Sequence, residues 1–198
     1  MKTFAFRSAA LAAALVVAMP LFGHAQTTSW TIDPAHSSTA FAIRHMGVST
    51  VHGSFYKVAG TVNWDDKDVT KSSVDATIDA TTVSTGVEAR DNHLKSPDFF
   101  DVAKFPTFTF KSTSVAKTGD GLKVTGDLTL HGVTKPVTLD VTDMSAPQTM
   151  GPEGKKKTVR GLTASTTVNR KDFGVGSTFA DAMLSDNVKI TIELELDK

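Results

Sequence analysis

The sequence predicts an all-β chain whose mostly antiparallel strands close, or nearly close, into a barrel. Apolar and polar residues alternate along most of the chain after residue 25, and a period of two residues is typical of half-buried strands. About eight to ten such segments follow one another, and one helical stretch around 85–101 interrupts them. Closing a sheet removes its exposed edges, so this pattern favours a barrel.

The first 25 residues are typical of a secretory signal peptide. Lys2 and Arg7 make a basic start, an apolar stretch rich in Ala, Leu and Val follows, and Gly23-His24-Ala25 places small residues where a signal peptidase cleaves. A membrane anchor is the less favoured alternative, because the stretch is shorter than the ~20 residues that span a bilayer. We therefore expect residues 1–25 to be removed and residues 26–198 to form one exported domain.

The composition excludes several classes of function. The chain has 198 residues, 40% of them hydrophobic, and no cysteine, which excludes disulfides, thiolate metal sites and cysteine nucleophiles. The signal peptide removes two of 21 basic residues and none of the 21 acidic ones, so the mature net charge is −2. A slightly acidic domain without a basic stripe is not expected to bind nucleic acid.

The alternating segments cover most of the mature chain. The clearest is 188–197, where Val, Ile and Leu alternate with Lys, Thr and acidic residues. Gly119-Asp120-Gly121 predicts a tight hairpin, and Pro136 is expected to begin a strand because proline cannot donate to a central ladder. Further alternating segments lie at 74–81, 107–111, 128–130, 137–141 and 162–168.

The interruption around 85–101 predicts one or two short helices. Thr85 and Glu88 have the spacing of a capping box, with Thr85 as N-cap. A second short turn is expected to start at Ser96-Pro97, with Ser96 as N-cap and Pro97 at the first helical position.

No motif predicts catalysis, a metal or a cofactor. The five histidines after residue 25 show no metal-ligand spacing, and the chain lacks a GxSxG elbow, a Walker sequence and GxGxxG. The stretch Arg90-Asp91-Asn92-His93-Leu94 is the most polar candidate, since Arg90 and His93 could hold a head group at a barrel mouth. The competing interpretation makes Arg90 a structural clamp on loop carbonyls or on the neighbours of Asp91.

A cluster of phenylalanines has two interpretations of the same kind. The cluster, which could line a cavity or fill a core, consists of Phe99, Phe100, Phe105, Phe108 and Phe110. Alternation alone does not distinguish a hollow barrel from a packed one.

Short blocks spread over essentially the whole mature chain match one known family in order and spacing. They are Trp30-Thr31-Ile32-Asp33, His36-Ser37, Phe41, Arg44-His45-Met46-Gly47, Gly53-Ser54-Phe55, Thr85-Gly86, Arg90-Asp91, His93-Leu94, Asp98-Phe99-Phe100, Phe105-Pro106, Thr109-Phe110, 128–137 and Arg170-Lys171-Asp172-Phe173-Gly174. Through these blocks the sequence closely resembles the YceI-like family of polyisoprenoid-binding proteins. The resemblance implies an eight-stranded antiparallel, lipocalin-like barrel that encloses an elongated apolar tunnel. It also implies binding of a long isoprenoid lipid, such as a polyprenyl phosphate or quinone, in the periplasm.

If the barrel encloses a tunnel, as the resemblance implies, the apolar side chains that point into it are candidate ligand contacts. We expect the tunnel to be lined by Phe41, Phe55, Phe99, Phe100, Phe108, Phe110, Leu128, Leu130 and Phe173. Arg90, His93 and His45 are the candidates for the head group. We expect no stable membrane insertion, and the sequence leaves a homodimer open.

Three alternatives remain open. The first is an enzyme that acts on an isoprenoid lipid through Asp91, Arg90 or His93. The second is a stress-response protein with a filled core. An outer-membrane barrel is the least favoured, because it would need aromatic girdles on its strands, whereas the aromatic residues gather around 99–110.

Overall fold

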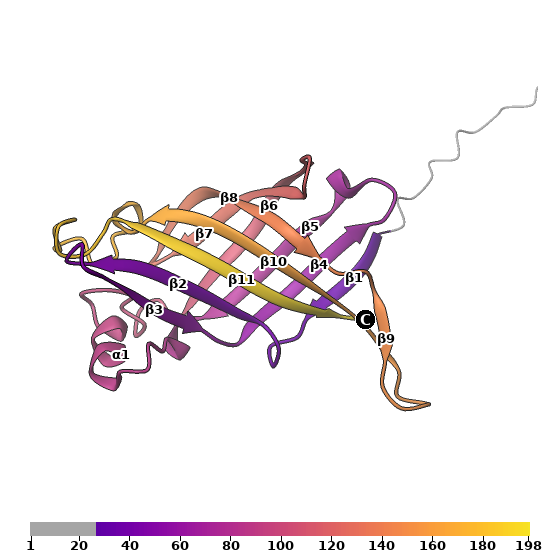
Figure 1. The fold of residues 1–198 in the computed structure, drawn as a ribbon, viewed down its shortest axis with the longest axis horizontal. Coiled ribbons are helices and arrows are strands. Elements are labelled where there is room, and N and C mark those ends of the chain that lie inside the picture. Colours follow the sequence, from indigo (N-terminus) through magenta and orange to yellow (C-terminus); the bar gives the residue numbers. More distant parts are fainter. Residues whose placement is uncertain (1–26) are drawn as a thin grey trace, which may run out of the picture.

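The computed structural model describes residues 27–198, and the predicted signal peptide lies outside these residues. Figure 1 shows an elongated barrel with α1 at one end and the C-terminus and β9 at the other. The strands are β1 (Thr27–Ile32), β2 (Ser38–His45), β3 (Ser49–Phe55), β4 (Val58–Asp65), β5 (Ser73–Asp79), β6 (Thr107–Lys117), β7 (Leu122–Leu130), β8 (Val133–Met144), β9 (Gln148–Met150), β10 (Lys157–Asn169) and β11 (Asn187–Asp197). The helices are α1 (Glu88–Lys95) and the 3₁₀ turns η1 (Val69–Lys71), η2 (Ala80–Thr82) and η3 (Arg170–Phe173).

Eight antiparallel strands close the barrel, which confirms the predicted fold class. The order around it is β1-β4-β5-β6-β7-β8-β10-β11, and β11 pairs back with β1. β11 also pairs with β2, which in turn pairs with β3. The C-terminal end of β11 lies beside β1 and its middle lies beside β2. β1 and β2 therefore act as two halves of one bent strand that runs the length of the barrel.

Two turn predictions have different outcomes. The hairpin at 119–121 is confirmed, since it joins β6 to β7 and Thr118 N donates to Gly121 O at 2.9 Å. The prediction that Pro136 begins a strand was wrong, because Pro136 is the fourth residue of β8. β8 pairs with β10 only between Asp140 and Met144, so proline stands where β8 has one neighbour, β7. A missing donor is tolerated on that open side.

One α-helix forms within the predicted region 85–101, and its start differs from the prediction. The capping box was wrong: the N-cap is Val87 and has no side-chain cap bond. Thr85 lies two residues earlier, where its backbone N and its hydroxyl both donate to Asp91 Oδ1. The predicted turn at Ser96-Pro97 forms, and Ser96 caps it: Asp98 N donates to Ser96 Oγ at 3.3 Å and Asp101 N donates to Ser96 O at 2.9 Å. It does not continue into a second helix.

The end of the barrel away from α1 is filled by side chains. Trp30 and Ile32 of β1 pack there with Leu194 and Leu196 of β11 and with Val58 and Val62 of β4. Arg160 of β10 is also buried at this end, with its guanidinium over Trp30 and Trp64. Farther along the interior, inward residues such as Leu139 and Ile192 are only half-buried. The barrel is therefore packed at one end and hollow beyond it.

Candidate ligand tunnel

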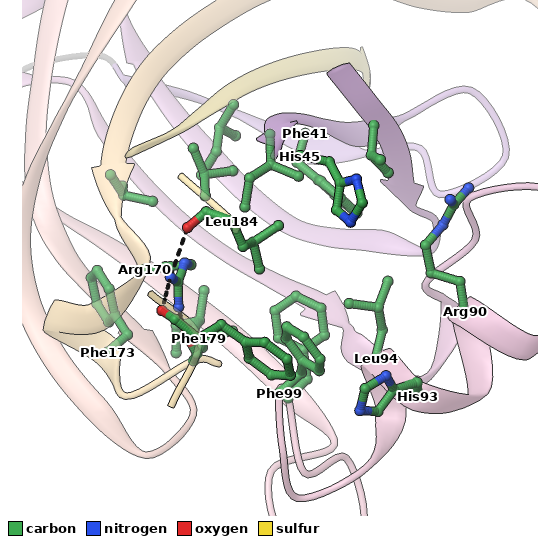
Figure 2. Close-up of a pocket in the computed structure, with 18 of the residues that line it drawn as sticks. Phe41, His45, Arg90, His93, Leu94, Phe99, Arg170, Phe173, Phe179 and Leu184 are labelled. Atoms are coloured by element: carbon green, nitrogen blue, oxygen red, sulfur yellow. Dashed lines mark hydrogen bonds between the residues drawn. The ribbon is translucent and has the colours of Figure 1, made fainter. Parts of the chain in front are cut away.

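A cavity of about 330 Å³ opens at the end of the barrel where α1 lies. Figure 2 shows side chains from several elements around it. The strands contribute Phe41, Ile43 and His45 of β2, Val51 and Phe55 of β3, Leu130 of β7, Val168 of β10, and Val188 and Ile190 of β11. The rest of the lining is Arg90, His93, Leu94, Phe99, Phe100, Arg170, Phe173, Val175, Phe179, Met183 and Leu184. We call this space the mouth cavity, and its volume is typical of small-molecule sites.

A second cavity of about 140 Å³ lies deeper in the barrel, and we call it the inner cavity. Its lining includes Phe108, Phe110, Leu128, Leu139 and Trp64. No charged side chain lines it among the described residues. Four residues line both cavities: Phe41, Phe55, Leu130 and Ile190. The two spaces are therefore neighbours along the barrel axis.

The structure places all nine predicted tunnel residues on a cavity wall. Phe99, Phe100 and Phe173 line the mouth cavity. Phe108, Phe110 and Leu128 line the inner cavity, while Phe41, Phe55 and Leu130 line both. A filled core, the second alternative from the sequence, does not describe this interior. Contact of these residues with a ligand stays a prediction.

Arg90 lines the mouth cavity and also holds the chain beside α1. Its Nε donates to Thr85 Oγ1 at 2.8 Å, and its Nη2 donates to Thr85 O at 3.2 Å. The Thr85 hydroxyl also lowers the pKa of Asp91 below its usual 3.8 by donating to the carboxylate. The clamp and head-group interpretations of Arg90 are thus compatible in geometry, because the same side chain reaches both the loop and the cavity.

His93 and His45 lie at the mouth as expected, on different walls (Figure 2). His93 Nε2 lies 2.9 Å from Asp98 Oδ2, and its ring meets Phe99 edge-on at a centroid distance of 5.0 Å. His45 ends β2, and it forms an isolated bridge to Leu184 in the loop that precedes β11. Two imidazoles and Arg90 are therefore among the hydrogen-bonding groups of the mouth.

Arg170 belongs to a block that matches the family, but the sequence predicted no role for it. The structure shows that it organises one wall of the mouth. Arg170 is 4% exposed and is a hydrogen-bond donor to the loop between η3 and β11. Its guanidinium donates to the carbonyls of Val175, Gly176, Phe179, Leu184 and Ser185 and to Asp186 Oδ1. Figure 2 shows the bonds to Phe179 and Leu184. We call residues 174–186 the mouth loop.

A charged cluster lies on the side of the barrel near the C-terminus. A carboxylate oxygen of Asp33, a ring nitrogen of His36 and a carboxylate oxygen of Glu195 lie within 4.8 Å of one another. Sequence spacing did not reveal this grouping, because Glu195 is on the last strand. His36 Nδ1 bonds Asp33 Oδ2 at 2.9 Å, which lowers the pKa of Asp33 and, with the nearby Glu195 carboxylate, raises the pKa of His36. The ammonium of Lys157 lies 3.6 Å from Asp33 Oδ2.

Comparison with known proteins assigns the chain to a family. The model of the YceI-like domain matches residues 30–196, which covers every barrel strand except the first three residues of β1 and the last of β11. The chain belongs to the YceI-like family. This YceI-like chain is 39% identical to Protein YceI of Escherichia coli O17:K52:H18 over 173 residues, 86% of this chain and 88% of that protein.

Two solved structures share the fold of this YceI-like chain. BcnA of Burkholderia cenocepacia matches with a TM-score of 0.70 at 24% identity, over 83% of this chain and 98% of BcnA. A polyisoprenoid binding domain from Saccharophagus degradans matches with a TM-score of 0.58 at 16% identity, over 84% of this chain and 97% of that domain. In residues 27–198 no helix has the length and apolar character needed to cross a membrane.

Proposed function

We propose that this YceI-like protein is a periplasmic binding or carrier protein for a long isoprenoid lipid of the polyprenyl phosphate or isoprenoid quinone type. The isoprenoid tail occupies the mouth and inner cavities, and the head group stays at the mouth. One observation carries the proposal. The cavity lining is apolar along the barrel, and its charged and imidazole side chains, Arg90, His93, His45 and Arg170, all belong to the mouth cavity.

The tail alone provides enough binding energy. An isoprenoid chain offers dispersion and desolvation but no hydrogen bonds, so it requires a long apolar site. At about 0.3 kcal/mol per heavy atom, roughly thirty carbons contribute ~9 kcal/mol, which corresponds to submicromolar affinity. The polar mouth is then left to discriminate among head groups.

Two further observations support the proposal. The Saccharophagus domain with the same fold is described as polyisoprenoid binding. The N-terminal 25 residues have the sequence pattern of a secretory signal peptide, which supports a periplasmic location.

Binding explains the polar residues better than catalysis does. Asp91 lines neither cavity, and its carboxylate accepts hydrogen bonds from Thr85. His93 Nε2 lies within hydrogen-bond distance of Asp98, and Arg90 donates to Thr85. The Asp91 carboxylate is thus held by Thr85 outside both cavities, and the Arg90 guanidinium, which stays protonated, is suited to binding rather than to acid–base chemistry.

The test is native mass spectrometry and organic extraction of the protein purified from its own periplasm. We expect a bound lipid whose extracted mass is that of an isoprenoid chain. A protein that carries no lipid and also excludes added polyprenyl chains would overturn the binding proposal.

The same preparation tests the location. We expect the intact mass of a chain that begins at Gln26 and is recovered in the periplasmic fraction. Recovery of the full-length chain in the membrane fraction would contradict export of a cleaved protein.

A further inference from the structure

The two cavities meet at a ring of four apolar side chains, which we call the waist. It consists of Phe41 of β2, Phe55 of β3, Leu130 of β7 and Ile190 of β11, the residues that line both cavities. Phe41 and Ile190 are register partners across β2 and β11, while Leu130 comes from a strand that is not adjacent to them. A tail that fills both cavities has to pass between these side chains.

The two aromatic rings of the waist are held unequally. Phe55 is 6% exposed and meets Phe100 and Phe108 edge-on, each at a centroid distance of 5.2 Å. Phe41 is only half-buried, and its one aromatic contact in the described part of the chain is Phe55, at 5.7 Å. Phe41 is therefore the ring that can change position at the smaller loss of packing.

The position of the Phe41 ring depends on a glycine in the neighbouring strand. Gly53 is the register partner of Phe41 in β3. A Cβ at Gly53 would overlap the Phe41 ring and would lie 2.8 Å from Thr85 Cγ2. The absence of a side chain at Gly53 thus leaves room for the ring against the β3 wall. An alanine there would displace the ring, because Thr85 occupies the other side.

We propose that Phe41, seated on Gly53, determines which isoprenoid tail lengths this protein binds. Tails short enough for the mouth cavity bind without disturbing the waist. Longer tails displace the Phe41 ring to enter the inner cavity. This inference rests on the proposed function and adds the residue that selects among its ligands.

The experiment measures affinity for a series of all-trans isoprenyl alcohols from about three to about nine isoprene units. Each buried five-carbon unit strengthens binding by about tenfold. The waist is tested by the affinity ratio of the longest to the shortest alcohol. We expect Phe41→Leu to raise this ratio by about tenfold, the contribution of one more buried unit, because only alcohols long enough to pass the waist gain from the wider passage. Gly53→Ala, which displaces the ring into the passage, should lower the ratio.

The matched control is Phe179→Leu, since Phe179 lines the mouth cavity alone. It should weaken all lengths alike and leave the ratio unchanged. An unchanged ratio in Phe41→Leu, or an equal shift in Phe179→Leu, would overturn the assignment of Phe41. If Gly53→Ala does not fold, the comparison of Phe41→Leu with Phe179→Leu still decides. Failure of the wild-type protein to bind any length would instead overturn the proposed function.

Discussion

The guanidinium carbon of Arg160 lies 4.7 Å from the centroid of the Trp64 ring and 5.6 Å from that of Trp30. This cation–π stack is buried, since Arg160 is 7% exposed and Trp30 is 2% exposed. Burial lowers the pKa of Arg160 below its ordinary value, while Nη2 donates to Ser145 O at 3.3 Å. The two tryptophans and the arginine together close the end of the barrel opposite the mouth.

Arg160→Ala should lower the free energy of unfolding by about 2–4 kcal/mol, because it removes two desolvated cation–π contacts and leaves a gap between the rings. Urea unfolding measures this change. Lys123→Ala is the control, since its ion pair with Asp140 is exposed and should contribute at most about 1 kcal/mol. Equal losses in the two variants would contradict a closing role for the arginine stack.

Arg170→Ala should loosen the mouth loop. The substitution leaves several carbonyls of 174–186 without their buried donor, and each hydrogen bond from a charged group contributes about 1.5–3 kcal/mol, not additively. We expect limited proteolysis to cut within the mouth loop much faster than in the wild type. Arg44→Ala is the control, because Arg44 also donates to turn carbonyls but is exposed. A mouth loop that stays resistant would show that Arg170 is not its clamp.

Arg90→Ala should weaken head-group discrimination more than overall retention. A charged hydrogen bond to a head group contributes about 1.5–3 kcal/mol, less than the ~9 kcal/mol of the tail. The measurement compares polyprenyl phosphate, quinone and hydrocarbon ligands, with melting curves of both proteins. Because Arg90 also donates to Thr85, some loss of melting temperature is expected. An unaltered preference order with a clear drop in melting temperature would show that Arg90 acts only as a structural clamp.

Phe108→Asp should abolish lipid retention, because Phe108 is 3% exposed and lines the inner cavity. An unpaired carboxylate there is costly to bury, so we expect the fold to be weakened as well. Phe108→Leu keeps the wall apolar and should fold and bind. Thr109→Asp on the outward face of β6 is the control and should retain lipid. Lipid loss in Thr109→Asp, or full retention in Phe108→Asp, would contradict a lipid-filled interior.

The cluster of Asp33 and His36 should make stability depend on pH. Asp33, by its hydrogen bond, and the Glu195 carboxylate raise the folded-state pKa of His36 above 6.5, so this contribution is complete below pH 6.5 and is lost as pH rises through the raised pKa. The pKa of Asp33 is held below 3.8, chiefly by His36, so its contribution is lost as pH falls below that value. Lys157 favours the Asp33 carboxylate and opposes protonation of His36.

The net contribution is therefore greatest between pH 3.8 and 6.5. His36→Asn should flatten the decline in melting temperature between about pH 6 and pH 8. His52→Asn, at an exposed histidine on β3, should leave the decline as it is in the wild type. The same decline of melting temperature with pH in the wild type, His36→Asn and His52→Asn would contradict a role for His36.

Alternation along single strands was sufficient to predict the class of the fold. The period of two in 188–197 and 107–111 holds because one face of each strand lies inside the barrel. The helix start was missed because Thr85 bonds Asp91 rather than the amide of Glu88, in a segment that is tied to β3 by the bridge between Ser84 and Ser54. Local sequence does not encode such neighbours.

The candidate site, like the fold, could be predicted only in part from the sequence. Phenylalanines that fill a core and phenylalanines that line a cavity have the same spacing, and the resemblance to a family was needed to favour the tunnel. The role of Arg170 was not predicted, because its carbonyl partners lie in a loop without a recognisable sequence pattern. The proximity of Glu195 to Asp33 results from barrel closure between β1 and β11.

In residues 27–198, the stack of Arg160 on Trp30 and Trp64 fills the end of the barrel opposite the mouth. Under the proposed function, a lipid that uses the mouth enters tail-first and leaves head-first, so the entry route fixes its direction in the barrel. The head group is the part that a donor or acceptor molecule meets in both events. Lipids with bulky polar groups at both ends are excluded by this geometry, because one of those groups would have to be buried among the side chains of the inner cavity.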